Sequence, residues 1–298
     1  DVLRNAISYK FQSFINSLGN SDFRIGVTSS DATGSRDFES GSLTRILSQA
    51  VPGAGVGVVP AQYILKPEST DLAQNFMATI MRPEAICTQV GTHLCPNSAD
   101  GYQQAIHSTL EALQRSDTVA QLIRPDAALH VVIISAHDEG EGTLTDSHGN
   151  ILSSAPSYNR PETLVNYVHQ TWPQKTFKVH AVIRKPTDSS CNDANIDDKK
   201  AYIYNSLVQM TGGKTAKICD DMNHSQVDAI AQAIHTNPPV FQLHCAPLDT
   251  NGDGVPDVTA TFNPQPATPI NVIVSGSTVT FSPVPPAGTN VHLRYQCP

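Results

Sequence analysis

Apolar residues in the first part of the chain follow helical and strand-like spacing in turn. Six apolar side chains within residues 1–18 recur at steps of three and four, which predicts an amphipathic helix. Phe23–Thr28 then has the character of a short buried strand. Leu129–Ser135 gives the strongest strand signal, because five of its seven residues are apolar and four are consecutive. Such a run is expected of a central strand with helices on both faces of its sheet.

The same alternation continues to about residue 237. Helical spacing is found near Leu43–Ala50, Leu72–Met81, Gly101–Leu113, Pro161–Trp172, Lys199–Met210 and Gln226–His235. Further strand-like segments are Gly57–Ile64, Phe177–Ile183 and Thr215–Cys219. Because strands and helices alternate, residues 1–237 are predicted to form an α/β domain with a doubly wound, mainly parallel sheet flanked by helices.

After Asn237 the pattern changes to short alternating segments separated by Pro, Gly and Asn. These segments predict strands at Val240–Cys245, Val258–Phe262, Ile270–Val274, Thr278–Phe281 and Val291–Gln296. The region is shorter than the ~100 residues of an immunoglobulin-type sandwich. We therefore expect residues 238–298 to form a small, β-sandwich-like module.

Charge and hydropathy exclude two classes of partner. The 298 residues include 19 Lys and Arg against 27 Asp and Glu, so the formal net charge is −8. Phosphate binding needs clustered positive charge, so nucleic acid is not expected as a partner. No apolar run approaches the roughly 18 residues that a membrane helix needs, so no membrane span is expected in this chain.

The six cysteines are even in number and lack the spacing of a zinc site. Disulfides are the better interpretation, and they imply an oxidising, extracytoplasmic compartment, either secreted or at the cell surface. Among fifteen possible connectivities, the in-order choice is Cys87–Cys95, Cys191–Cys219 and Cys245–Cys297.

Several segments, in this order, resemble the von Willebrand factor A-type domain as found in bacterial surface and secreted proteins. They are the opening helix with Phe23–Asp31, the stretch Ile123–Glu139, and Cys191 followed by Tyr202 and Thr211-Gly212-Gly213 before Cys219. The resemblance covers roughly residues 1–237, and a β module often follows in that branch. It implies a doubly wound α/β fold, with an adhesion site for a divalent metal ion at the loop rim.

Two departures from the family pattern concern this adhesion site. Such domains begin with a central strand ending in an Asp-x-Ser-x-Ser metal loop, whereas this chain starts at the following helix. A doubly wound sheet without its middle strand would expose unpaired backbone groups. We therefore expect the strand to lie upstream in the parent protein, or to be contributed by another chain.

The second departure follows the strong strand, where the family usually has Ser-Asp-Glu-x-Asp. Here the sequence is Ser135-Ala136-His137-Asp138-Glu139, and alanine cannot bind a cation. The resemblance leaves a degenerate adhesion-site rim of Thr92, Ser135, Asp138 and Glu139. Since Mg²⁺ tolerates poor octahedral geometry badly, we do not expect magnesium or manganese at this rim.

A separate metal pattern lies in the β module. Oxygen-bearing residues alternate at Asp249, Asn251, Asp253 and Asp257, and the Val255 carbonyl is placed to complete a calcium loop. Position twelve is Ala260 rather than a bidentate Glu, so the loop is not an EF-hand. The pattern predicts calcium as a cofactor, and a hairpin turn without an ion is the alternative.

Sequence patterns for catalysis are weak. His137, Asp138 and His148 could bind a transition metal in a metallohydrolase, but no HExxH helix accompanies them, and a solvated loop has the same composition. Gly-x-Ser-x-Gly and both phosphate-binding glycine patterns are absent. We therefore do not expect an enzyme.

The sequence thus predicts an extracytoplasmic adhesion or protein-interaction protein that binds a partner through the rim of an A-type domain. Its partner would be a protein or a surface glycan. The alternative is a structural subunit of a surface fibre, in which a donated strand joins neighbouring subunits, because strand addition is an established mode of recognition.

Overall fold

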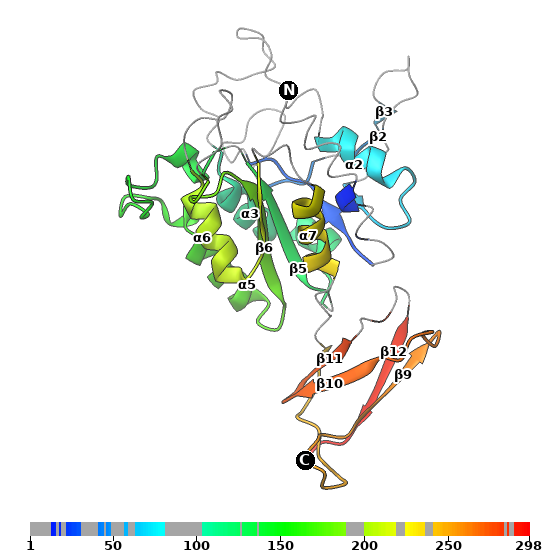
Figure 1. Cartoon of the computed structure of the whole chain (residues 1–298). Helices are drawn as coiled ribbons and strands as arrows, with labels where there is room; N and C mark the ends of the chain where they lie inside the picture. Colours follow the sequence, from blue (N-terminus) through cyan, green and yellow to red (C-terminus); the bar gives the residue numbers. More distant parts are fainter. Residues whose placement is uncertain are drawn as a thin grey trace.

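The structure is a computed structural model of the whole chain (Figure 1). It describes residues 13–15, 18, 22–30, 41–44, 46–48, 57–58, 63–80, 103–125, 127–135, 137–188, 200–218, 224–235, 241–282, 285 and 289–298. Thr92 and the cysteines Cys87, Cys95, Cys191 and Cys219 lie outside these residues, as does most of the opening helix, of which residues 13–15 are helical.

A three-stranded parallel sheet with the order β5–β6–β7 forms the centre of the α/β part. β5 (Leu129–Ile134) pairs along its whole length with β6 (Phe177–Ile183), and the end of β6 pairs with β7 (Thr215–Lys217). All but one of the β6 residues are buried, whereas four of the six β5 residues are only half-buried. Among the described strands, β6 therefore lies in the middle of this sheet and β5 at its edge, whereas the sequence predicted Leu129–Ser135 as the central strand.

Helices cover both faces of this sheet (Figure 1). On one face, an apolar cluster joins the sheet to α3 (Ala105–Gln114), α5 (Pro161–Thr171) and α6 (Tyr202–Thr211). On the other face, a second cluster includes side chains of α7 (His224–His235) and α2 (Leu72–Ile80). The chain is therefore mixed α/β, with a parallel sheet between two helical layers.

Two consecutive glycines fix the turn between α6 and β7. Gly212 ends the helix with a φ of 66°, in the left-handed region that favours glycine. A Cβ on Gly213 would lie 1.8 Å from the Val179 carbonyl oxygen, so only glycine lets the chain pass this close to β6. The helix predicted near Lys199–Met210 is confirmed as α6, and it ends before these two glycines.

Shorter elements complete the α/β part. β1 (Ile25–Gly26) pairs antiparallel with β4 (Ile64–Leu65), and β2 (Leu47–Ser48) pairs antiparallel with β3 (Gly57–Val58). The helix predicted near Leu43–Ala50 is therefore wrong at residues 47–48, where backbone pairing to β3 replaces helical bonds. One short helix, α4 (Ser116–Leu122), was not predicted.

The β module contains two small antiparallel sheets, of order β10–β11–β8 and β12–β9. Their strands are β8 (Phe241–Gln242), β9 (Val258–Asn263), β10 (Asn271–Ser275), β11 (Thr278–Ser282) and β12 (Asn290–Tyr295). Both sheets share a core around Phe281, whose ring meets those of Phe241 and Phe262 edge-on. The predicted disulfide Cys245–Cys297 is present, with Cα atoms 5.8 Å apart.

In the part of the chain that the structure describes, no helix has both the length and the apolar character needed to cross a membrane. The longest helix there, α7, has 12 residues.

Candidate functional site

Asp138 lies just beyond the carboxyl end of β5 and is fully buried. Its Oδ2 accepts a hydrogen bond from the Ile203 N–H at 2.9 Å, and its Oδ1 accepts one from the Tyr204 N–H at 3.2 Å. Both donors belong to the first turn of α6, where backbone N–H groups have no partner within the helix. Asp138 therefore caps α6 and does not face solvent.

Glu139 makes the equivalent contacts with α3. Its two carboxylate oxygens accept hydrogen bonds from the N–H groups of Ile106 (3.0 Å) and His107 (3.3 Å). The Asn159 side-chain amide also donates to it, at 2.6 Å. Glu139 is fully buried. Asp138 and Glu139, which the resemblance assigned to a degenerate adhesion-site rim, therefore lie in the interior, where two helix N-termini attract their carboxylates.

Both carboxyl groups are hard to ionise. Burial raises the pKa of Asp138 to about 6 and the pKa of Glu139 to about 7, although the backbone hydrogen bonds act in the opposite direction. The Tyr204 phenol is also buried, which raises its pKa, and its oxygen accepts a hydrogen bond from the Ala105 N–H at 3.2 Å. These groups form a closed polar network that joins β5 to α3 and α6.

Ser135 is buried at the end of β5. Its Oγ donates to the His137 carbonyl at 2.7 Å and also contacts the side chain of Gln103. His148 lies in an exposed turn, where its N–H donates to Asp146. Among the described residues, no three His, Cys, Asp or Glu side chains lie close enough together to hold a metal ion. His137, Asp138 and His148 are thus not assembled as a metal centre here.

Another polar feature of β5 is its outer edge. The Leu129 N–H donates to the Thr176 carbonyl and the Ser135 N–H donates to the Val182 carbonyl, so the odd-numbered residues of β5 face β6. In a parallel ladder, the alternate residues present their N–H and C=O groups to the opposite side. For Val132 and Ile134 that side has no hydrogen-bond partner within the described ranges.

This edge lies toward β1. Val132 and Ile134 pack in the same apolar cluster as Phe23, Ile25 and Val27, yet β1 pairs with β4 and not with β5. Figure 1 places β1, drawn in blue, on the β5 side of the parallel sheet. Two sheets therefore share one core across an edge of β5 that no described strand pairs with.

In the loop of the β module that resembles a calcium site, the Asp carboxylates accept hydrogen bonds from other groups of the same loop. Asp249 accepts hydrogen bonds from the N–H groups of residues 252, 253 and 254, at 2.7, 3.2 and 2.7 Å. Asp253 accepts one from Val255, and Asp257 accepts from Thr250 and Asn251. The hydrogen bond from Thr250 lowers the pKa of Asp257. The oxygens suit calcium chemically, but the three carboxylates of this loop do not lie close enough together to hold a metal ion in this arrangement.

The sequence did not point to the partners of these residues. Asn159 and the Tyr204 N–H donate to Glu139 and Asp138, and Gln103 contacts Ser135, yet all three are distant in the chain from the residues they contact. His130 Nδ1 lies 3.1 Å from His180 Nε2, although the two residues are 50 positions apart in the chain. Burial lowers the pKa of His130 to about 4 and that of His180 to about 3, so both rings are neutral at pH 7.

Comparisons with known proteins place the chain in no family: no family model, curated protein or solved structure matches it.

Proposed function

We propose that this chain is an extracytoplasmic protein-interaction module that accepts one further β-strand along the outer edge of β5. The observation that supports this most strongly is the pair of outward-facing N–H and C=O groups on Val132 and Ile134, for which the described residues offer no partner. An unpaired backbone group that is removed from water costs roughly 1–3 kcal/mol. Strand addition satisfies several such groups at once.

The proposed strand is apolar on both of its faces. β5 directs Ile133 into the cluster with α3, α5 and α6, and it directs Val132 and Ile134 into the cluster with α7. A strand added beside β5 lies between the same two layers, and strands covered on both faces are rich in Val, Ile and Leu. Such a strand would also connect the β1–β4 pair to the parallel sheet, as the proposed von Willebrand factor A-type arrangement requires.

Metal-dependent adhesion at the rim is less well supported. Asp138 and Glu139 are buried and accept hydrogen bonds from the first turns of α6 and α3, so binding a metal ion would leave those N–H groups without their acceptors. Assembly by strand donation, as in a surface fibre, needs only the open edge. We therefore place the non-enzymatic interaction at β5.

Two further proposals concern the environment. The disulfide Cys245–Cys297 is consistent with an oxidising compartment, either secreted or at the cell surface. We also propose that calcium stabilises the β module, because Asp249, Asn251, Asp253 and Asp257 are oxygen donors on one exposed loop. Binding would require these donors to turn toward a common centre.

Strand acceptance can be tested with a synthetic peptide of eight residues, rich in Val and Ile and with Lys at both ends. Calorimetry should detect its binding. The matched control is the same peptide with every backbone nitrogen methylated, which has no N–H group to donate to a strand edge and should bind at least about tenfold more weakly. Equal binding of the two peptides, or binding of neither, would contradict the proposal. Sedimentation over a concentration range shows whether a second copy supplies the strand.

A further inference from the structure

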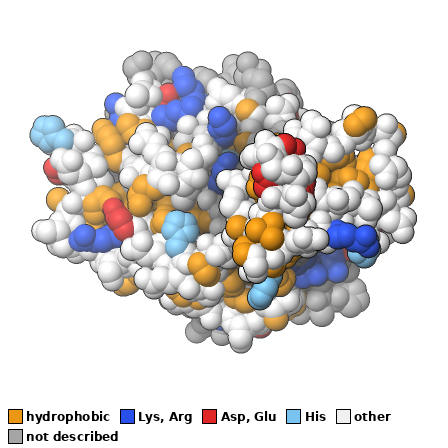
Figure 2. Space-filling model, turned by 90° about the horizontal axis from the view of Figure 1, so that it is seen from below, with side chains coloured by type: hydrophobic (Ala, Val, Ile, Leu, Met, Phe, Trp, Pro, Cys, Tyr) orange, Lys and Arg blue, Asp and Glu red, His pale blue; other side chains and the backbone are white. Residues whose placement is uncertain are grey.

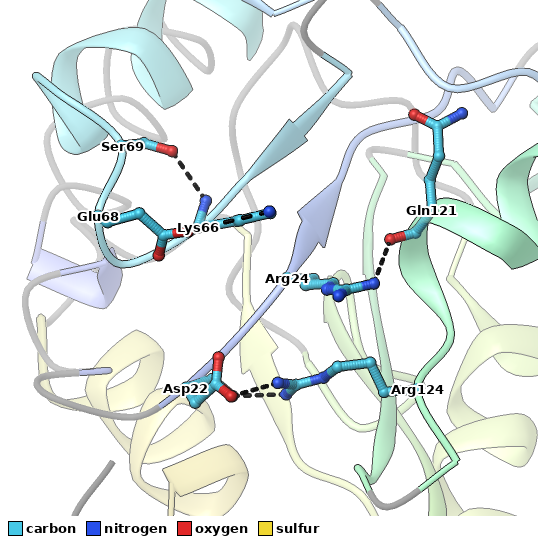
Figure 3. A network of polar contacts seen from close by, with 7 residues as sticks. All are labelled: Asp22, Arg24, Lys66, Glu68, Ser69, Gln121 and Arg124. Atoms are coloured by element: carbon cyan, nitrogen blue, oxygen red, sulfur yellow. Dashed lines mark hydrogen bonds and ion pairs between the residues drawn. The ribbon is translucent and has the colours of Figure 1, made fainter. Parts of the chain in front are cut away.

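An open groove lies where β1, β4 and α4 meet. It has a volume of about 560 Å³, and its walls include Arg24, Tyr63, Lys66 and Gln121. We refer to it as the β1–β4 groove. Figure 3 shows its polar side chains, with the Lys66 ammonium directed toward the side on which Arg24 lies. The protein as a whole is negatively charged, with a formal net charge of −8, whereas this groove contains two cationic side chains.

Within the groove, the contacts that Arg24 and Lys66 make with other protein groups would compete only weakly with a bound anion. Arg24 Nη1 donates to the Gln121 carbonyl at 2.8 Å, which uses one of the five N–H donors of its guanidinium. Lys66 Nζ lies 3.9 Å from Glu68, and both side chains of this pair are largely exposed, at 46% and 73%. An exposed ion pair contributes only about 0–1 kcal/mol, so Glu68 holds Lys66 weakly.

Hydrogen bonds and an ion pair join the chain segments that lead into β1 and β5. Arg124 Nη2 donates to the Asp22 carbonyl at 2.7 Å, and Arg124 also forms an ion pair with the Asp22 carboxylate. Lys175 Nζ donates to the carbonyls of Arg124 and Ala127, at 2.5 and 2.8 Å. These contacts tie the chain before β1 to the chain before β5. Figure 2 shows the molecule from below, with Lys and Arg side chains in blue at several separate places on this face.

We propose that the β1–β4 groove binds a carboxylate side chain on a peptide segment of a partner protein. The Arg24 guanidinium can hold a carboxylate with two parallel hydrogen bonds, and Lys66 adds a second positive charge. Tyr63 and the buried Ile64 give the groove an apolar wall that suits the residues beside an Asp or Glu. Glu68 disfavours densely charged ligands, such as phosphate or sulfated glycans, more than a single carboxylate.

This site is independent of the strand-accepting edge of β5, since none of its walls belongs to β5. The probe is a fluorescein-labelled peptide with an amidated end, Gly-Leu-Glu-Tyr-Glu-Leu-Gly, compared by fluorescence anisotropy with its Gln-for-Glu version. The acidic peptide should bind at least about tenfold more tightly than the neutral one. Its affinity should fall as NaCl is added, because salt screens exposed charges.

Three variants locate the site. Arg24→Gln with Lys66→Gln should weaken binding of the acidic peptide about tenfold, whereas the charge-matched pair Lys214→Gln with Arg294→Gln, both exposed, should leave it within about twofold. Glu68→Gln should strengthen binding about threefold, a gain that misfolding cannot produce. Unchanged affinity in the first variant, or equal losses in both pairs, would overturn the proposal. So would displacement of the peptide by inorganic phosphate or a sulfated disaccharide at lower concentrations than by unlabelled peptide.

Discussion

Polar groups lie in two places on or next to β5, and the two places differ in whether these groups have hydrogen-bond partners. At its carboxyl end, Asp138 and Glu139 are buried, and their oxygens accept hydrogen bonds from the first turns of α6 and α3. Along its outer edge, the backbone groups of Val132 and Ile134 have no partner in the described part of the chain. The carboxyl groups after the strand thus have hydrogen-bond partners, whereas the backbone groups along its outer edge have none among the described residues.

This contrast changes where an interaction is to be sought. Carboxylates after a strand suggest a ligand site, but here the N-termini of two helices already satisfy them. An apolar strand suggests only core, but here its backbone can still form hydrogen bonds. The capacity to bind a partner therefore lies in the backbone of β5 rather than in its neighbouring acids.

The largest effect on stability is expected from removing the Asp138 carboxylate. Asp138→Ala removes both acceptors for the first turn of α6, so the free energy of unfolding should fall by about 2 kcal/mol. Chemical denaturation monitored by circular dichroism measures this loss. Asp138→Asn, which keeps one acceptor oxygen, should lose less. If the alanine variant were as stable as the wild type, Asp138 would not cap α6.

A second test separates the charge of Glu139 from its hydrogen bonds. Because its pKa is about 7 in the folded protein and near 4.5 when unfolded, its stabilising contribution is complete below about pH 4.5 and is lost as the pH rises through 7. Glu139→Gln does not titrate. Relative to the wild type, this variant should therefore gain at least about 1 kcal/mol of stability between pH 5 and pH 8.

The control for this pH dependence is the His130–His180 pair, whose lowered pKa values have the opposite effect. Their contribution is present above about pH 6.5 and is lost as the pH falls through 4. Denaturation curves of wild type and Glu139→Gln should therefore differ at pH 8 and share the acid loss. Parallel pH profiles over the whole range would contradict the burial of the Glu139 charge.

The carboxylates in the acidic loop of the β module are at the surface, unlike the buried carboxyl groups of Asp138 and Glu139. Calcium should raise the melting temperature of the module by a few degrees, because a ligand that binds only the folded state stabilises it. Asp253→Ala should remove this shift. The variant Glu162→Ala, which changes an exposed acid of α5, should retain it. A calcium shift that survives Asp253→Ala would place the ion elsewhere.

Much of the fold could be predicted from local patterns. Phe177–Ile183 was predicted with the bounds of β6, and the change of spacing after Asn237 separated the β module from the α/β part. The disulfide Cys245–Cys297 followed from the order of the cysteines. These features depend on residues that are close in sequence or on a strong apolar period.

The rest depends on partners far away in the chain. β5 and β6 are both apolar, so spacing alone could not decide which of them is central. Leu43, Ile46 and Leu47 have helical spacing, yet residues 47–48 pair with β3. The burial of Asp138 is determined by α6, which begins more than sixty residues later. No pattern around Asp138 contains that information.

The open edge of β5 can be measured directly by amide hydrogen exchange of the free chain, followed by NMR. The N–H groups of Val131 and Ile133 bond to β6, whereas those of Val132 and Ile134 face outward. We expect the outward pair to exchange at least about a hundredfold faster than the inward pair, because protection requires a hydrogen bond that must open. Equal protection of all four amides would mean that the edge is already paired, and would contradict strand acceptance at β5.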